Sequence, residues 1–135
     1  LACCLGVDGR HATVPPSAAA EVNQLPPDLE TMRATAARAL ALPGPAPADE
    51  MDLLLGQLRG HLALMVDDVE HLVHVQPAGE ELRACLALAG VREGRRKLDL
   101  PERRTPTGQF ALARRLARVL AALCNHHDHL TGVRP

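Results

Sequence analysis

The chain has 135 residues and a mass of 14.4 kDa, enough for one domain and too short for two ordinary ones. Its composition is 47% hydrophobic and 23% charged, with a formal net charge of −1, which excludes a disordered chain and a strongly basic nucleic-acid binder. The apolar residues include 23 Leu and 22 Ala but no Ile, Trp or Tyr, which predicts an all-α fold and argues against a β-sandwich or barrel.

The cysteines and the lengths of the apolar runs indicate in which cellular compartment the protein is expected. No two of the four cysteines form a Cys-x-x-Cys pair, and a chain of this length needs no disulfide framework, so we predict a reducing cytoplasm. No apolar run approaches the roughly 20 residues of a membrane span. No basic segment precedes an apolar stretch, so we expect neither a membrane anchor nor a signal peptide.

The ordered domain is expected over residues 28–131. Residues 1–27 contain several glycines and prolines without an apolar period, which predicts a disordered leader. Asp28 is a suitable N-cap for a first helix, which should end before Pro43.

The second predicted helix, 49–75, has the clearest period in the chain. Asp49 is its expected N-cap, and apolar residues recur every three or four positions at Met51, Leu55, Leu58, Leu62, Met65, Val69 and Leu72. Gly56 and Gly60 lie one turn apart in it. Because glycine costs about 1 kcal/mol relative to alanine inside a helix, we expect a close helix crossing there.

The third helix is predicted over 80–98 and the fourth over 107–130. The third has two apolar stripes on nearly opposite sides: one is Leu82, Leu86 and Ala89, and the other is Ala84, Leu88 and Val91. A helix that is apolar on two sides is central or faces a second subunit. Four helices with short connections predict an antiparallel bundle.

A cluster of acidic and histidine residues lies on the second helix. Asp67, Glu70, His71 and His74 share one face, like the ligands of carboxylate-bridged dimetal bundles. This face points away from the apolar stripe, and no second acidic Glu-x-x-His occurs, so we interpret it as a solvated face.

Cysteine and histidine near the core give a second metal hypothesis. Two thiolates and two imidazoles, from His61, Cys85, Cys124 and His127, would suit tetrahedral zinc. The alternatives are a Cys–His nucleophile or simply buried side chains. His127 falls on the apolar stripe of the fourth helix, whereas His126 and His129 are predicted to face outward and to suit an adventitious metal at most.

Charge is distributed unevenly along the chain. Residues 1–90 carry five basic and twelve acidic residues, whereas residues 91–118 carry nine basic and three acidic ones. The basic patch is expected to pair with the acidic second helix or a protein partner; nucleic acid is less favoured, because stacking aromatic residues are lacking. The candidate interaction residues are Arg59, Arg92, Arg95, Arg96, Arg114, Arg115, Arg118, Leu88 and Val91.

Several stretches, in order, carry a family resemblance: residues 28–33, 58–62, 68–70, 83–91, 93–98 and 113–118, followed by Leu123-Cys124. Together they resemble the small actinomycete proteins of a domain of unknown function labelled "natural product biosynthesis protein". The Arg59-Gly60-His61 element carries part of the resemblance. This chain departs from the family pattern at 125–127, where an acidic residue, His and Tyr are expected, and near 66–67, where a proline is expected.

The resemblance implies an association with secondary metabolism and no established activity, ligand or catalytic residue. The residues and the resemblance together predict a cytoplasmic accessory or regulatory protein that acts through contact with a protein partner or as a homo-oligomer. No catalytic residue and no cofactor are predicted, and membrane association is not expected. The alternatives are a metal-binding helical protein and weak nucleic-acid binding through the arginine cluster.

Overall fold

The computed structural model describes residues 27–132. This part of the chain folds into four α-helices and contains no strand, which confirms the predicted all-α class. The helices are α3 (Leu29–Ala41), α4 (Ala48–His74), α5 (Glu81–Leu98) and α6 (Pro106–Thr131). The predicted leader lies outside the described residues, apart from Pro27.

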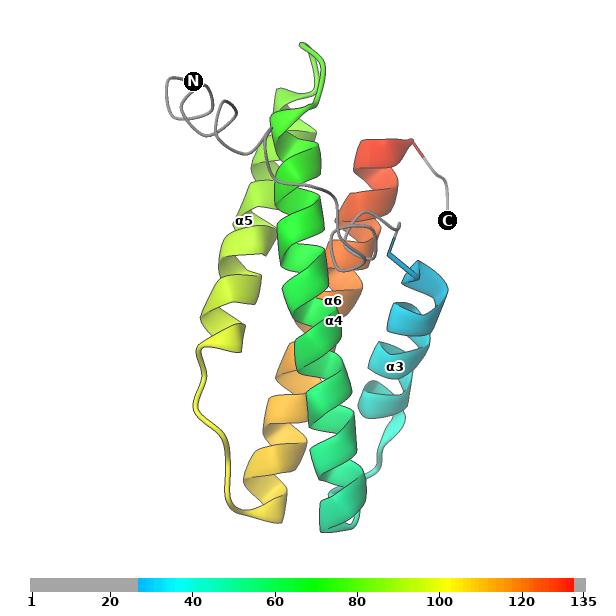
Figure 1. The fold of residues 1–135 in the computed structure, drawn as a ribbon, viewed down its shortest axis with the longest axis vertical. Helices are drawn as coiled ribbons and strands as arrows, with labels where there is room; N and C mark the ends of the chain where they lie inside the picture. Colours follow the sequence, from blue (N-terminus) through cyan, green and yellow to red (C-terminus); the bar gives the residue numbers. More distant parts are fainter. Residues whose placement is uncertain (1–26, 133–135) are drawn as a thin grey trace, which may run out of the picture.

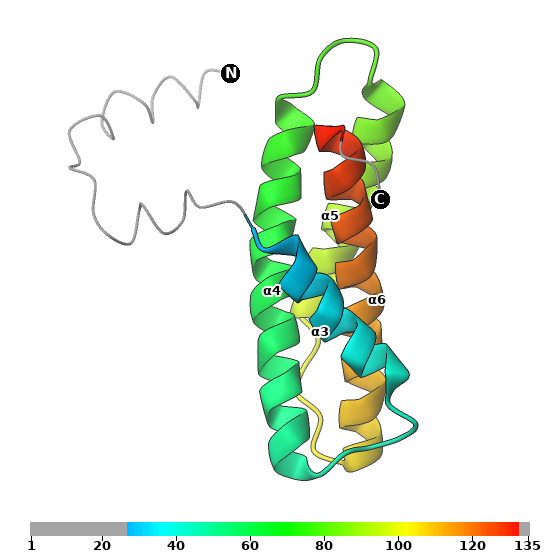
Figure 2. The ribbon, with the colours of Figure 1, turned by 90° about the vertical axis from the view of Figure 1, so that its right-hand side faces the viewer.

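Two long helices form the centre of the bundle. α4 and α6 pack against each other, and α3 and α5 lie on opposite sides of this pair without touching one another. Each helix runs antiparallel to the one before it, and α3 crosses α4 and α6 obliquely (Figures 1 and 2). The four helices therefore form an antiparallel bundle in which α3 and α5 each have an outer side without a neighbouring helix.

Several helix ends follow local capping rules, but the starts of α4 and α5 have no side-chain cap. The Asp28 side chain accepts a hydrogen bond from the backbone N–H of Thr31 at 3.0 Å, so the predicted N-cap is confirmed. Gly132 ends α6 in the left-handed conformation, with a φ of 79°. The predicted cap of the second helix is wrong: α4 begins at Ala48 after Pro47, and Asp49 lies within its first turn.

The core consists mainly of leucine, methionine and alanine from α3, α4 and α6. Six of the seven apolar residues predicted for the stripe of the second helix are buried, and Leu72 packs half-buried against them. α6 contributes Leu112, Leu116, Leu120 and Leu123. The period of 3.6 residues therefore identified the inner face of α4 correctly.

The tight helix approach lies in α5 rather than in α4. A Cβ atom added at Gly56 or Gly60 would meet nothing within 4 Å, so the expected crossing at these glycines is wrong. At Gly94 it would lie 2.7 Å from Cγ2 of Val66, and at Gly90 it would lie 3.0 Å from Cδ2 of His126. α5 therefore approaches α4 and α6 so closely that only small side chains fit.

None of the helices between residues 27 and 132 combines the length and the apolar character needed to cross a membrane.

Candidate interaction surface

The outer face of α5 carries an apolar stripe exposed to solvent. Leu82 is 73% exposed and Leu86 is 54% exposed, and Cys85 and Ala89 are exposed beside them. These residues follow one another at helical spacing over about two turns. We call Leu82, Cys85, Leu86 and Ala89 the α5 outer stripe. Large leucines this exposed on one helix face are typical of a contact surface.

The sequence prediction placed the contact surface on the opposite stripe, and the structure contradicts this prediction at Val91. Val91 is fully buried against the core, and Leu88 is half-buried. The reason is the size of the side chains. Gly90 and Gly94 let α5 lie close to α4 and α6, so the space between the helices holds Ala87 and Val91 but not a row of leucines. A glycine pair one turn apart is not by itself a signal of this packing, because Gly56 and Gly60 of α4 have the same spacing and face open space.

Arg95 joins the basic segment to the acidic face of α4. Its guanidinium donates two hydrogen bonds to the Glu70 carboxylate, at 2.7 and 3.1 Å, and lies 3.7 Å from Asp67. These hydrogen bonds lower the pKa of Glu70 and raise the pKa of Arg95. The Asp67 side chain is 84% exposed, and His71 and His74 are exposed, so this cluster is a solvated face with an ion pair.

Two other predicted contact arginines hold the bundle together. Arg59 of α4 donates to the backbone carbonyls of Leu98 and Leu100, at 3.3 and 3.4 Å, at the end of α5. Arg114 donates to the Leu40 carbonyl at 2.8 Å and lies over the Phe110 ring. Their guanidinium groups therefore serve intramolecular contacts rather than an open surface.

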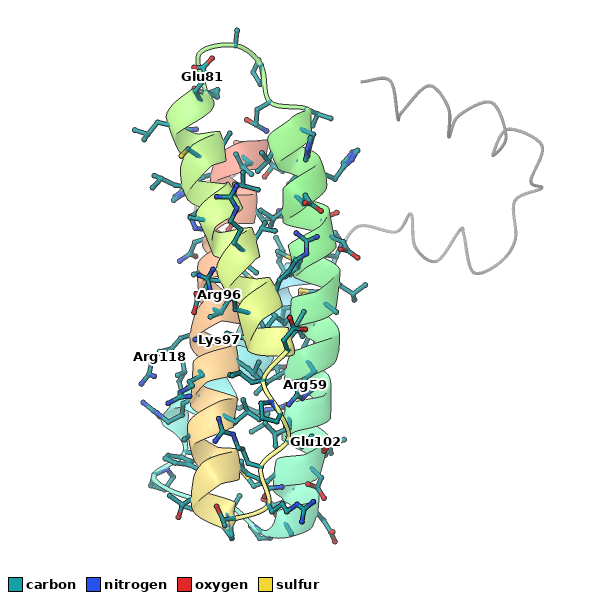
Figure 3. All side chains as sticks on the ribbon, turned by 90° about the vertical axis from the view of Figure 1, so that its left-hand side faces the viewer. Arg59, Glu81, Arg96, Lys97, Glu102 and Arg118 are labelled. Atoms are coloured by element: carbon teal, nitrogen blue, oxygen red, sulfur yellow. The ribbon has the colours of Figure 1, made fainter. Side chains whose placement is uncertain are left out.

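The remaining predicted arginines are exposed on the outer sides of α5 and α6. Arg92, Arg115 and Arg118 form no ion pair with another described residue, whereas Arg96 shares Glu93 with Lys97. Arg96, Lys97 and Arg118 lie on the same side of the bundle (Figure 3). We call Arg92, Arg96, Arg115 and Arg118 the arginine surface. Arg92, one of its members, lies one turn beyond the end of the α5 outer stripe.

The four proposed zinc ligands do not converge. Cys85 is exposed on the outer face of α5, Cys124 is buried in the core, and His61 faces α3. Residues 27–132 hold no group of three or more His, Cys, Asp or Glu side chains arranged to bind a metal ion. The zinc hypothesis is therefore not supported by this geometry.

The Cys–His nucleophile is disfavoured by the surroundings of the thiol. Burial raises the pKa of Cys124, against the smaller opposing effect of Arg33. A nucleophilic cysteine needs a lowered pKa and access to its substrate, and Cys124 has neither. It is a core residue of α6.

Polar groups around α3 act as structural links. Arg33 donates to Asn125 at 2.9 Å and forms an ion pair with the buried Asp128, both on α6. Nε2 of His61 lies 3.4 Å from the Thr35 hydroxyl, which itself donates to a backbone carbonyl. Burial lowers the pKa of His61. These groups fasten α3 to α6 and α4.

The histidines at the end of α6 divide differently from the prediction. Nε2 of His127 lies 2.7 Å from the Asp68 carboxylate of α4, and its buried Nδ1 has no partner within residues 27–132. His127 is thus held between helices, as its place on the apolar stripe predicted. His126 packs against Gly90 of α5 instead of facing outward, and burial lowers its pKa; His129 is exposed, as predicted.

The fold and these contacts define the class: a small helical bundle whose polar clusters are structural and whose outer α5 and α6 faces are open. The chain belongs to the family of unknown function DUF6415, whose profile matches residues 30–132. This match confirms that the chain is a member of a family of unknown function. Neither the curated proteins nor the solved structures include a match to the chain.

Proposed function

We propose that this protein is a non-catalytic accessory or regulatory protein that acts by protein–protein contact. The observation that carries the proposal is the α5 outer stripe, with Leu82 and Leu86 more than half exposed and the exposed Arg92 of the arginine surface one turn beyond its end. Exposed apolar residues beside charges without partners favour recognition of a protein that offers apolar and acidic side chains.

We further propose that the protein works in the cytoplasm in natural product biosynthesis. The support is the resemblance of its sequence to actinomycete proteins with that label, together with the absence of a Cys-x-x-Cys pair.

An acidic protein partner is favoured over nucleic acid because the described chain has one aromatic side chain, Phe110, and Arg114 already covers it. Nucleic-acid binding would therefore rest on phosphate contacts alone.

The test is affinity capture from the organism that carries the gene, with the wild-type chain and two matched variants. We expect Arg115→Glu/Arg118→Glu to lose at least ten-fold of a partner that the wild type retains. Arg103→Glu/Arg104→Glu makes the same charge change at exposed loop positions and should retain the partner. Equal capture by all three chains would contradict the proposal. Material that disappears after nuclease treatment would instead establish nucleic-acid binding.

A further inference from the structure

The α5 outer stripe has opposite charges near its two ends. Glu81 lies at the N-terminal end of α5, and Arg92 follows the stripe at its C-terminal end. Both side chains are exposed, and neither forms an ion pair with another residue in 27–132. Hydrogen bonds from the backbone N–H groups of Gly79 and Glu81 lower the pKa of Glu81, so this carboxylate is charged at neutral pH.

We propose that the α5 outer stripe binds the α5 outer stripe of a second copy of this chain, with the two helices antiparallel. This inference deepens the proposed function, because it names one occupant of the proposed contact surface. A two-fold axis near Leu86 and Ala87 would relate the two chains. Leu82 and Leu86 of one chain would then cover Leu86 and Ala89 of the other.

The charge pattern selects the antiparallel orientation. Glu81 and Arg92 are eleven residues apart, which is about three turns, so both project from the same flank of α5. In an antiparallel pair with a central two-fold axis, residues of the same flank meet across the interface. Glu81 of each chain therefore lies beside Arg92 of the other, giving two ion pairs. In a parallel pair the same flank of the two chains would lie on opposite sides of the interface, so neither of these ion pairs would form.

The inner face of α5 supports this geometry. Gly94 and Gly90 hold the helix against α4 and α6, and the Arg59 hydrogen bonds secure its C-terminal end. The outer stripe is therefore presented on a fixed element rather than on a loop. Because the patch is about two turns of one helix, it falls below the roughly 1,200 Å² typical of stable interfaces. We expect a reversible dimer with a dissociation constant of about 10–100 µM.

Sedimentation equilibrium of the full chain between about 5 and 300 µM tests the dimer. We expect the wild type to shift from monomer to dimer in this range and Leu82→Glu/Leu86→Glu to remain monomeric throughout. The matched control is Leu53→Glu/Leu64→Glu on α4, where the leucines are 65% and 57% exposed, and it should dimerise like the wild type. A monomeric wild type, or a dimer that resists the α5 variant, would overturn the proposal. Circular dichroism confirms that each variant is folded.

Charge exchange tests the orientation. Arg92→Glu alone would place carboxylates together at both ends of the interface and should weaken the dimer at least ten-fold. Adding Glu81→Arg to the same chain restores two opposite-charge pairs and should return the dissociation constant to within about three-fold of the wild type. Failure of the second substitution to restore binding would exclude the antiparallel pairing.

Cys85 gives an independent readout of distance. The proposed two-fold axis places the two Cys85 residues on one flank, about 4.5 Å apart along the helix axis at 1.5 Å per residue. With Cys3 and Cys4 changed to Ser, mild oxidation should link two chains through Cys85, since Cys124 is buried. Leu82→Glu/Leu86→Glu should abolish this link. If the wild type does not dimerise but still captures a partner that depends on Arg115 and Arg118, only the self-association is rejected. If the wild type dimerises but captures no such partner, only the partner proposal is rejected.

Discussion

α3 and α5 lie on opposite sides of the same helix pair and are held there in different ways. α3 buries Met32, Ala36 and Ala39 and adds polar links, of which the ion pair from Arg33 to Asp128 is the most buried. α5 buries Ala87, Val91 and Gly94 and leaves Leu82 and Leu86 exposed. The two helices therefore show that the apolar side of a helix is not always its buried side.

The difference teaches how close approach competes with apolar burial. Burying a leucine stabilises a protein by about 1.5–3 kcal/mol, but it also requires space between helices. Where Gly90 and Gly94 allow backbone contact, many small van der Waals contacts take the place of that burial. Leu82 and Leu86 of α5 are then free for contact with another molecule.

The largest effect on stability is expected from a larger side chain at Gly94, where α5 packs closely against α4. Gly94→Val should lower the free energy of unfolding by about 3 kcal/mol, because even its Cβ atom would lie 2.7 Å from the rigid side chain of Val66. Chemical denaturation measures this change. Gly60→Val is the control in open space and should change stability by less than about 0.5 kcal/mol. Equal effects at the two positions would show that the packing is looser than described.

Removing the polar link of α3 comes next in size. Arg33→Ala should cost about 2 kcal/mol, because it leaves the Asp128 carboxylate, with a side chain only 10% exposed, without its cation. The effect stays below that of a fully buried pair because the Arg33 side chain is 36% exposed. Arg38, also on α3, donates an exposed hydrogen bond to Gln57 of α4. Arg38→Ala should lower the free energy of unfolding in urea by less than about 0.5 kcal/mol. A similar loss in both variants would argue against a special role of Asp128.

Acid should lower the free energy of unfolding through one partly buried histidine beside α3 and one beside α5. Burial lowers the pKa of His61 beside α3 and of His126 beside α5, so the unfolded chain binds more protons than the folded chain near neutral pH. The stability that these neutral imidazoles contribute is present above about pH 6.5 and is lost as the pH falls through their folded pKa values. Thermal unfolding between pH 7.5 and 5 should show a shallower slope in His61→Gln and in His126→Gln. An unchanged slope in both variants would contradict this assignment.

The smallest effect is expected at the α5 outer stripe. Leu86→Ala should change the free energy of unfolding of the monomer by less than about 0.5 kcal/mol, because the side chain is 54% exposed. Met32→Ala on α3 removes a side chain that is 2% exposed and should cost about 2–4 kcal/mol. Unfolding at low protein concentration keeps the chain monomeric for this measurement. A large loss at Leu86 would mean that the leucine supports the fold itself.

Much of the fold could be predicted because α3, α4 and α6 follow the usual amphipathic pattern. Asp28 marked the start of α3 by side-chain capping, which is a local property of the sequence. The start of α4 at Ala48 could not be predicted in the same way. Its first turn has no side-chain cap, and Pro47 rather than Asp49 precedes the helix.

The exposed stripe of α5 was harder to predict because it depends on which neighbours α5 touches. Its two apolar stripes are similar in hydropathy, and the distance between helices decides which one is buried. The sequence also predicted Arg59 and Arg114 to be cations on an interaction surface. Their partners are backbone carbonyls far along the chain, at Leu98 and Leu40, and no residue type signals such a partner.

The bridge from Arg59 to the end of α5 has a consequence for local opening. Because one side chain of α4 holds carbonyls at Leu98 and Leu100, the last turn of α5 cannot fray without releasing a residue in the middle of another helix. Amide hydrogen exchange in that turn should therefore report on a concerted opening that includes the following loop, rather than on the ordinary unravelling of a helix terminus.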